Sequence, residues 1–176
     1  MAFERDLGDG LSLALRTPRM AHAVHALAAA NLERLQLWEP WAHAFDPAGP
    51  DETWDREQLR RYIDGTAIPT VVMHEGRAIG SVSARIDRYS GTGDIGYWLD
   101  AGAEGRGIAQ RACQALIDEM LAGGVHRVEI RTAAHNVRSI RLAERLGFTH
   151  EGTLRSAVPV GPVRHDVAVY GLLAPA

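Results

Sequence analysis

The feature that most constrains this sequence is a glycine-rich segment at residues 100–107. It lies between an expected strand at 94–99 and an expected amphipathic helix that begins at Ile108. The amides that open a helix have no partner within it and lie at the positive end of its dipole. Such a turn can hold a diphosphate, and Gly105 and Gly107 would let phosphate oxygens approach the backbone closely. A tight turn without a ligand is the alternative interpretation of the same glycines.

The hydrophobic pattern of the remaining chain indicates a mixed α/β fold. Strands are expected at 11–16, 70–74, 78–86, 94–99, 126–132, 148–155 and 164–172, and helices at 17–36, 52–64, 108–122 and 136–146. Antiparallel hairpins come first and strand–helix–strand units follow, which predicts a mixed sheet of about seven strands flanked by about four helices. With 176 residues, the chain is expected to form a single domain, 1–176, with a core from about 11 to 172.

Composition excludes several classes of protein. The net charge is -3 and all 19 basic residues are arginine, so neither broad nucleic-acid affinity nor chemistry that needs a lysine is expected. Cys113 is the only cysteine and is expected in the core, and the histidines show no metal-ligand spacing, so we expect no metal site. No apolar run long enough for a membrane span and no signal peptide are recognised, which predicts a cytoplasmic protein without a membrane partner.

A nicotinamide-dependent oxidoreductase is a weaker interpretation of the glycine-rich segment. The residues from Gly105 begin the pattern G-x-G-x-x-G, but its third glycine position is Gln110. The antiparallel strands expected ahead of the loop also differ from the strand–helix–strand unit that opens dinucleotide-binding folds.

Four segments carry one resemblance: Tyr97-Trp98-Leu99, the loop 104–109, Asn136 and Ser139, and the segment 145–148. Together they resemble the GNAT acetyltransferase superfamily, and in particular its RimJ/RimL-like branch of ribosomal-protein and related N-acetyltransferases. The resemblance extends from about residue 11 to residue 172. It implies a GNAT-like, mostly antiparallel central sheet, acetyl-CoA as co-substrate and an amine as acceptor.

The resemblance places the diphosphate of acetyl-CoA on the glycine-rich loop. In the family this loop reads Gln or Arg, two residues, Gly, one residue, and Gly or Ala; the matching positions here are Glu104, Gly107 and Ala109. The expected diphosphate contacts are Gly105, Arg106, Gly107, Ile108 and Ala109. A carboxylate at 104 should repel the diphosphate unless it turns outward, and Arg106 or Arg111 could offset its charge.

The same resemblance assigns the rest of the cofactor site. Backbone groups of Trp98, Leu99 and Asp100 are expected to contact the pantetheine arm, and an exposed N–H there would stabilise the oxyanion as the amine attacks. Asn136 would bond the pantetheine, and Ser139 would lie near the sulfur and protonate the departing thiolate, or donate to it through water. The alternative for this pair is structural, with Asn136 as an N-cap and Ser139 in the first turn of its helix.

Two carboxylates are candidates for the general base. Asp94 matches a glutamate that related sequences often carry two residues before the glycine of this strand, and Glu39 lies in a loop that should border the acceptor channel. Because an α-amino group has a pKa near 8, a modest base or a water relay suffices. The structural alternatives are a turn-terminating aspartate for Asp94 and a solvated loop charge for Glu39. Residues 156–160, where some relatives carry a further glutamate, contain no acid.

Aromatic residues follow the first expected helix. Trp38, Trp41, Phe45 and Trp54 could form a hydrophobic mouth for the acceptor, a dimer contact or an ordinary packed loop. We prefer the mouth, with Trp38 and Trp41 as acceptor contacts. His165 resembles a histidine that the family has near the start of its last strand, and it is expected to line the channel or to be structural.

These expectations describe an acetyl-CoA-dependent N-acetyltransferase that acts by direct attack in a ternary complex. Its acceptor would be a primary amine, either a protein N-terminal α-amino group or a small-molecule amine. The alternative is a non-catalytic acetyl-CoA-binding regulatory module, suggested by Glu104 and by the missing acid in 156–160. Dimers are common in the family that the chain resembles, so a homodimer is one expected assembly.

Overall fold

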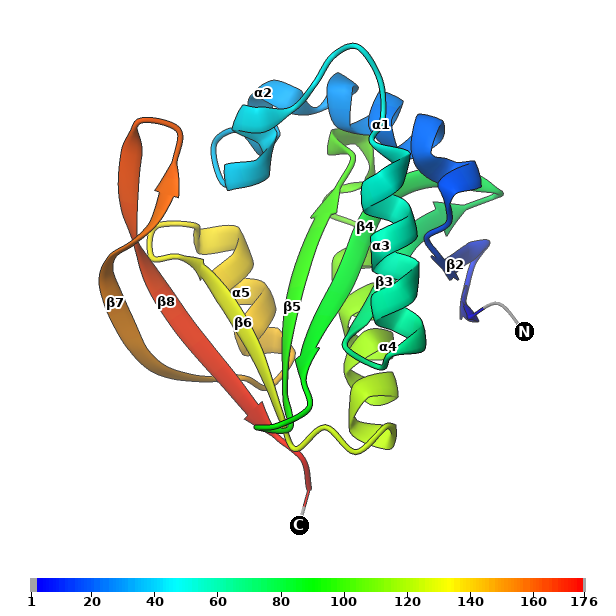
Figure 1. The fold of residues 1–176 in the computed structure, drawn as a ribbon. Coiled ribbons are helices and arrows are strands. Elements are labelled where there is room, and N and C mark those ends of the chain that lie inside the picture. Colours follow the sequence, from blue (N-terminus) through cyan, green and yellow to red (C-terminus); the bar gives the residue numbers. More distant parts are fainter. Residues whose placement is uncertain (1–2, 176) are drawn as a thin grey trace.

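Eight strands form one continuous sheet in the computed structural model, which describes residues 3–175 (Figure 1). The strands are β1 (Glu4–Gly8), β2 (Leu11–Leu15), β3 (Ala67–His74), β4 (Arg77–Asp87), β5 (Thr92–Leu99), β6 (Arg127–Ala133), β7 (Thr149–Val160) and β8 (Val163–Leu173). Their order is β1-β2-β3-β4-β5-β6-β8-β7, and every neighbouring pair except β5 and β6 is antiparallel. The predicted mixed, mostly antiparallel sheet is confirmed, with one strand more than expected.

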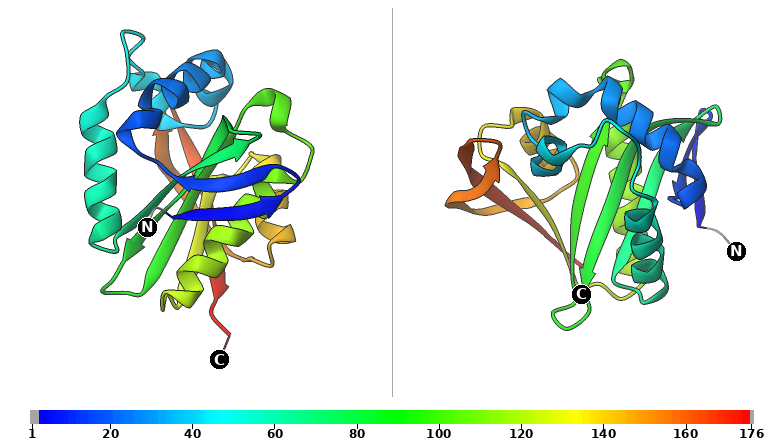
Figure 2. Two further views of the ribbon diagram at one scale, coloured as in Figure 1. Left: turned by 90° about the vertical axis from the view of Figure 1, so that its right-hand side faces the viewer. Right: turned by 45° about the horizontal axis from the view of Figure 1, so that its top comes forward.

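Helices cover both faces of this sheet. The helices are α1 (Ala21–Ala30), α2 (Leu32–Leu35), α3 (Glu52–Ile63), α4 (Ile108–Ala122) and α5 (Val137–Arg145), with the short 3-10 helices η1 (Pro18–Met20), η2 (Pro40–Ala44) and η3 (Ala101–Ala103). Figure 2 shows α3 on one face and α4 with α5 on the other, while α1 and α2 cross one end of the strands. The main core therefore lies between the sheet and α4 and α5.

The core follows from two local patterns. In α4, apolar side chains three or four positions apart form one buried stripe, and Cys113 on this stripe is fully buried, which confirms its expected place in the core. β3 is central in the sheet and six consecutive residues of it, from Ala67, are buried, because helices or strands cover both of its faces. The helix α4 ends at Ala122, as the sequence predicted, with Gly123 as its C-cap.

The N-terminal part differs from the expectation in two ways. β1 was not predicted, because this edge strand is mostly exposed and shows no apolar alternation. The single helix expected at 17–36 is instead divided into η1, α1 and α2, and Thr17 makes no side-chain capping bond. The division between α1 and α2 falls at Asn31, whose backbone leaves the helical region. Five helices therefore stand where about four were expected.

The division at Asn31 has a tertiary cause. Its Nδ2 donates to Leu27 O (2.9 Å) and to Asp100 Oδ1 (2.8 Å), and its Oδ1 accepts from the Ala101 amide (3.0 Å). These bonds tie the joint between α1 and α2 to the segment that follows β5.

The last two strands are longer than expected. β7 reaches Val160, whereas the sequence predicted a strand at 148–155 followed by a connection through 159–162. Ser156 has a φ of 52° inside an irregularity of the β7–β8 pairing between Leu154 and Val158. The strand therefore continues past a bulge that its sequence pattern does not announce.

Candidate functional site

The two parallel strands β5 and β6 separate partway along their length. Only Thr92, Gly93 and Asp94 of β5 pair with β6, against residues 127–129. Beyond these pairs both strands continue, and they diverge toward the end of the sheet that α2 approaches (Figure 1). The backbone on this side of β5 has no neighbouring strand, so a ligand can pair with it.

The register of β5 decides which backbone groups face this opening. The Asp100 amide donates to Ile79 O of β4 (2.8 Å), and the pairing with β4 is uninterrupted from Thr92 to Leu99. Since backbone groups of successive residues point to opposite sides of a strand, those of Trp98 face β4 and those of Leu99 face the opening. Of the expected pantetheine contacts Trp98, Leu99 and Asp100, Leu99 is therefore the one whose amide can reach a ligand there.

The loop between β5 and α4 has the geometry of an anion site. Gly105 and Gly107 have left-handed φ angles of 76° and 72°, and a Cβ at either position would meet no atom within 4 Å. Among residues 3–175, the backbone amides of residues 105–109 find no hydrogen-bond partner. The expected contacts at Gly105, Arg106, Gly107, Ile108 and Ala109 thus present free amides at the start of a 15-residue helix. This arrangement fits a diphosphate.

Glu104 is paired with two arginines. Its Oε1 accepts from Arg34 Nη1 of α2, its Oε2 accepts from Arg138 Nη1 of α5, and its side chain is 30% exposed. Arg34 also donates through Nη2 to Leu99 O. We refer to Arg34, Glu104 and Arg138 as the Glu104 clamp; it links α2, the glycine-rich loop and α5.

The clamp corrects one expectation from the sequence. Arg111 donates to Asp9 Oδ2 (3.0 Å) and to Gly8 O (2.9 Å) at the end of β1, and not to Glu104. Arg106 forms no hydrogen bond or ion pair within the described part of the chain. The charge of Glu104 is therefore offset by residues from α2 and α5 rather than by Arg106 or Arg111.

Asn136 and Ser139 lie at the start of α5. Asn136 is the N-cap of this helix, and its Oδ1 accepts from the Ser139 amide (3.3 Å). The structural alternative for Asn136 is therefore present. Across residues 3–175, neither the Asn136 side-chain amide nor the Ser139 hydroxyl donates a hydrogen bond, so both groups can still donate to a ligand. Their cofactor roles stay predictions.

Glu39 is a half-buried carboxylate at the start of η2. Trp41 Nε1 donates to its Oε2 (3.0 Å). Burial raises the pKa of Glu39 above its ordinary value, and the bond from Trp41 counteracts only part of this rise. A raised pKa suits a base, and the role of Glu39 stays a prediction.

The side chain of Tyr97 connects Ser139 with Glu39. Burial raises the pKa of Tyr97 far above its ordinary value, the Ser139 side chain lowers it, and the nearby charge of Glu39 raises it further. Both side chains therefore contribute to the electrostatic environment of the Tyr97 hydroxyl. The sequence analysis used Tyr97 only as part of a motif and missed its side chain, whose only signal was its place in the strand that precedes the loop.

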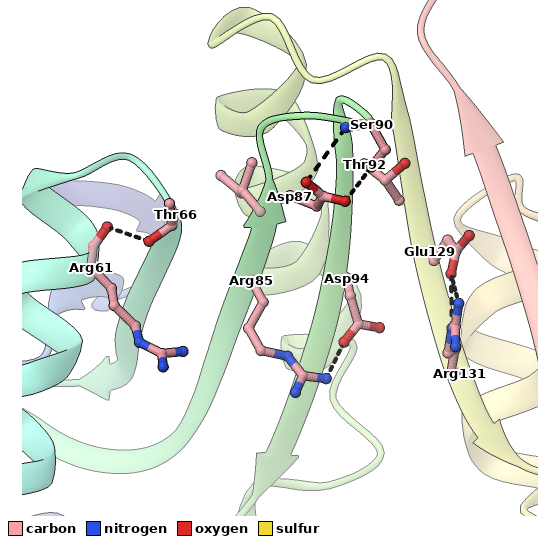
Figure 3. A pocket seen from close by; sticks show the side chains of 10 residues that line it. Arg61, Thr66, Arg85, Asp87, Ser90, Thr92, Asp94, Glu129 and Arg131 are labelled. Carbon is pink, nitrogen blue, oxygen red and sulfur yellow. Dashed lines mark hydrogen bonds and ion pairs between the residues drawn. The ribbon is translucent and has the colours of Figure 1, made fainter.

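Asp94 lies apart from this group. It is three positions before Tyr97, so its side chain points to the opposite face of the strand, roughly 10 Å away along it. Its Oδ2 accepts from Arg85 Nη2 (2.5 Å), and both residues line an open, charged pocket of about 750 Å³ on the face of the sheet (Figure 3). The structure does not bring Asp94 together with Ser139, which makes Glu39 the better-placed candidate base.

Aromatic rings from separate segments meet at the opening. Trp38 contacts His135, with ring centroids 5.1 Å apart, and His135 contacts His165 at 4.7 Å. Trp41 contacts Trp98 at 6.2 Å. The three expected acceptor contacts therefore belong to two sets of rings: Trp38 and His165 lie on either side of His135, and Trp41 lies against Trp98.

The other two members of the expected aromatic cluster lie elsewhere. Phe45 stacks on His25 at 4.6 Å, and the Trp54 ring lies 4.5 Å from the Arg16 guanidinium. The four aromatic residues therefore do not form one mouth, because α3 directs Trp54 toward the end of β2.

Within residues 3–175, no helix combines the length and the apolar character needed to cross a membrane. No three metal-ligating side chains of the same residues gather into a group that could hold an ion.

Known proteins similar to this chain share one chemistry. Residues 12–149 match the family model described as "Acetyltransferase (GNAT) domain". The chain is 30% identical over 176 residues to the Bacillus subtilis (strain 168) protein named "Putative ribosomal N-acetyltransferase YdaF", covering 97% of this chain and 95% of that protein.

Two solved structures extend the comparison. The ribosomal-protein-S5-alanine acetyltransferase from Vibrio fischeri has a TM-score of 0.88 at 26% identity, covering 99% of this chain and 97% of that one. The microcin C7 self immunity acetyltransferase MccE, in complex with acetyl-CoA and AMP, has a TM-score of 0.89 at 25% identity, covering 95% and 94%.

Proposed function

This chain belongs to the GNAT acetyltransferase family, and on that premise we propose that it acetylates a primary amine by direct attack within a ternary complex. The chain is an N-acetyltransferase, an acyltransferase whose co-substrate is acetyl-CoA. The observation that carries the proposal is the divergence of β5 and β6 beside the free amides of residues 105–109. An opening in a sheet next to an anion site suits a long cofactor with a diphosphate at one end and a thioester at the other.

Each group at the opening has a separate role in the reaction. Acetyl-CoA supplies an activated thioester. The amides of residues 105–109 bind the diphosphate, and the Leu99 amide donates to the thioester oxygen as negative charge develops there. Glu39 accepts a proton from the incoming ammonium group, and Ser139 donates a hydrogen bond to the sulfur as the C–S bond breaks.

We further propose a protein N-terminal α-amino group as the acceptor. The relative from Bacillus subtilis is named a putative ribosomal N-acetyltransferase, and the one from Vibrio fischeri is named a ribosomal-protein-S5-alanine acetyltransferase. The rings of Trp38, Trp41 and His165 offer flat surfaces against which an extended peptide can pack. A small-molecule amine is the competing acceptor, because one similar structure is named for microcin self immunity.

Peptides with free N-terminal serine or alanine test this proposal. Incubated with the chain and acetyl-CoA, they should gain the mass of one acetyl group at the α-amine, whereas the same peptides with a blocked N-terminus should not react. Small amines, amino sugars and polyamines form the comparison panel. Binding of acetyl-CoA without transfer to any of these amines would contradict the enzyme and support the regulatory module.

We further propose the domain organisation, the compartment and the assembly of this enzyme. We place one catalytic domain over 1–176 in the cytoplasm, where the ribosomal proteins named for the relatives are made, without a nucleic-acid or membrane partner. We also propose a homodimer, for which exposed apolar side chains such as Leu37 and Trp41 offer an interface. Analytical ultracentrifugation distinguishes this dimer from a monomer.

A further inference from the structure

A buried hydroxyl without a partner lies next to the proposed reaction centre. Tyr97 Oη is buried and forms no hydrogen bond to any residue in the range 3–175. Leaving a buried hydroxyl unpaired is costly, and native structures rarely do so. A partner for this hydroxyl is therefore expected once the site is filled.

The surroundings of this hydroxyl point to Ser139. Tyr97 belongs to the part of β5 that β6 does not pair with, and its ring packs against the core that α4 covers. The Ser139 side chain lies close enough to lower the pKa of Tyr97, although the two hydroxyls do not form a hydrogen bond of normal geometry.

Tyr97 is suited to hydrogen bonding and not to proton transfer. Burial is the main reason why its pKa lies above the ordinary value, and the charge of Glu39 acts in the same direction. The phenol therefore keeps its proton at neutral pH. It can give Ser139 one directed hydrogen bond throughout the reaction.

We propose that Tyr97 is a positioning residue that orients the Ser139 hydroxyl toward the thioester sulfur, an inference that rests on the proposed function. Tyr97 Oη donates to Ser139 Oγ, which leaves the Ser139 O–H free to donate to the sulfur. Two hydrogen bonds linked in series through one hydroxyl strengthen each other.

The transfer of the acetyl group takes no net proton from the hydroxyl of Tyr97 or of Ser139. The amine nitrogen forms a bond to the acyl carbon, the C–S bond breaks, and its electron pair remains on sulfur. The hydrogen bond from Ser139 stabilises this thiolate until water protonates it. The protons that the amine loses pass to Glu39 and to water, so Tyr97 and Ser139 finish with the protons they had at the start.

A double-mutant cycle of Tyr97→Phe and Ser139→Ala tests this role. Tyr97→Phe should lower kcat about 3- to 10-fold with the KM for acetyl-CoA unchanged, because one neutral hydrogen bond to the leaving group is lost. In the Ser139→Ala background, Tyr97→Phe should have no further effect. Equal losses in both backgrounds, or an unchanged kcat for Tyr97→Phe alone, would overturn the proposal. Tyr170→Phe removes the hydroxyl of another tyrosine whose ring packs in the same core and serves as the control.

A binding measurement replaces kinetics if Ser139→Ala proves too slow. The ultraviolet absorbance of the thiolate reports the pKa of the bound CoA thiol. This pKa should be about 0.5 to 1 lower in the wild type than in either single variant, and the double variant should match the single variants. Equal values in all four proteins overturn the proposal.

Different results would contradict the proposed function and the role of Tyr97. A wild-type chain that binds no CoA removes the proposed function and this inference with it. A wild-type chain that binds CoA and acetylates amines, but whose kcat is unaffected by Tyr97→Phe, removes only the role of Tyr97.

Discussion

The burial of Glu39 affects both chemistry and stability. Burial raises the pKa of this carboxyl above its ordinary value of 4.5, so the fold favours its protonated form. The stability gained in this way is complete below about pH 4.5 and is lost as the pH rises through the raised value. At neutral pH the ionised carboxylate is therefore held in an unfavourable environment, which makes it a stronger base for an incoming ammonium group.

Replacing Glu39 with glutamine should separate these two effects. Without a base, kcat/KM is expected to fall about 10²-fold, and the increase of activity with pH that follows the ionisation of Glu39 should disappear. The melting temperature should rise at neutral pH, because a buried charge is removed, and this gain should shrink below about pH 4.5. Thermal melts and pH–rate profiles measure both.

The control for this substitution is Glu33→Gln, which removes an exposed carboxylate from α2. Full activity in Glu39→Gln, together with a large loss in Asp94→Asn, would transfer the role of base to Asp94 and contradict the assignment.

Among the helices and strands, those with a strong local pattern could be predicted from the sequence, and the joints between them could not. The glycine-rich loop and α4 follow from glycines beside an apolar stripe, and both lie where the sequence indicated. The division between α1 and α2 depends on a bond from Asn31 to Asp100, 69 positions away, which no local pattern contains. β1 was missed for a related reason, since an exposed edge strand needs no apolar face.

At the site, the partners of Glu104 could likewise not be predicted from the sequence. From the sequence, an acid in the diphosphate loop is unfavourable, and only neighbouring arginines are available to offset it. The fold instead brings Arg34 from 70 positions away and Arg138 from 34 positions away. The clamp therefore lets the loop keep an acid in a position where the family has Gln or Arg.

Arg138→Ala tests this interpretation of the clamp. It leaves Glu104 with one partner near the diphosphate, so the KM for acetyl-CoA should rise about 3- to 10-fold through electrostatic repulsion. Adding Glu104→Gln should return the KM toward the wild-type value. Arg141→Ala removes an exposed guanidinium from the same helix and should change little. An unchanged KM in Arg138→Ala would mean that the carboxylate does not influence the diphosphate site.

The fold as a whole joins the two substrate regions through one opening in the sheet. α4 and α5 cover one face, α1 and α2 cross the end of the strands, and β5 diverges from β6 between them (Figures 1 and 2). Asn31 binds Asp100 and Ala101, and Arg34 binds Leu99 and Glu104. The segment that carries Glu39 follows α2 directly, so the candidate base is anchored to the same loop that presents the free amides.

A crystal structure of the chain with acetyl-CoA provides the decisive measurement. We predict diphosphate oxygens within hydrogen-bonding distance of the amides of residues 105–109, the thioester oxygen facing the Leu99 amide, and the sulfur beside Ser139. A diphosphate bound away from this loop, or an opening between β5 and β6 that stays empty at saturating acetyl-CoA, would contradict the account.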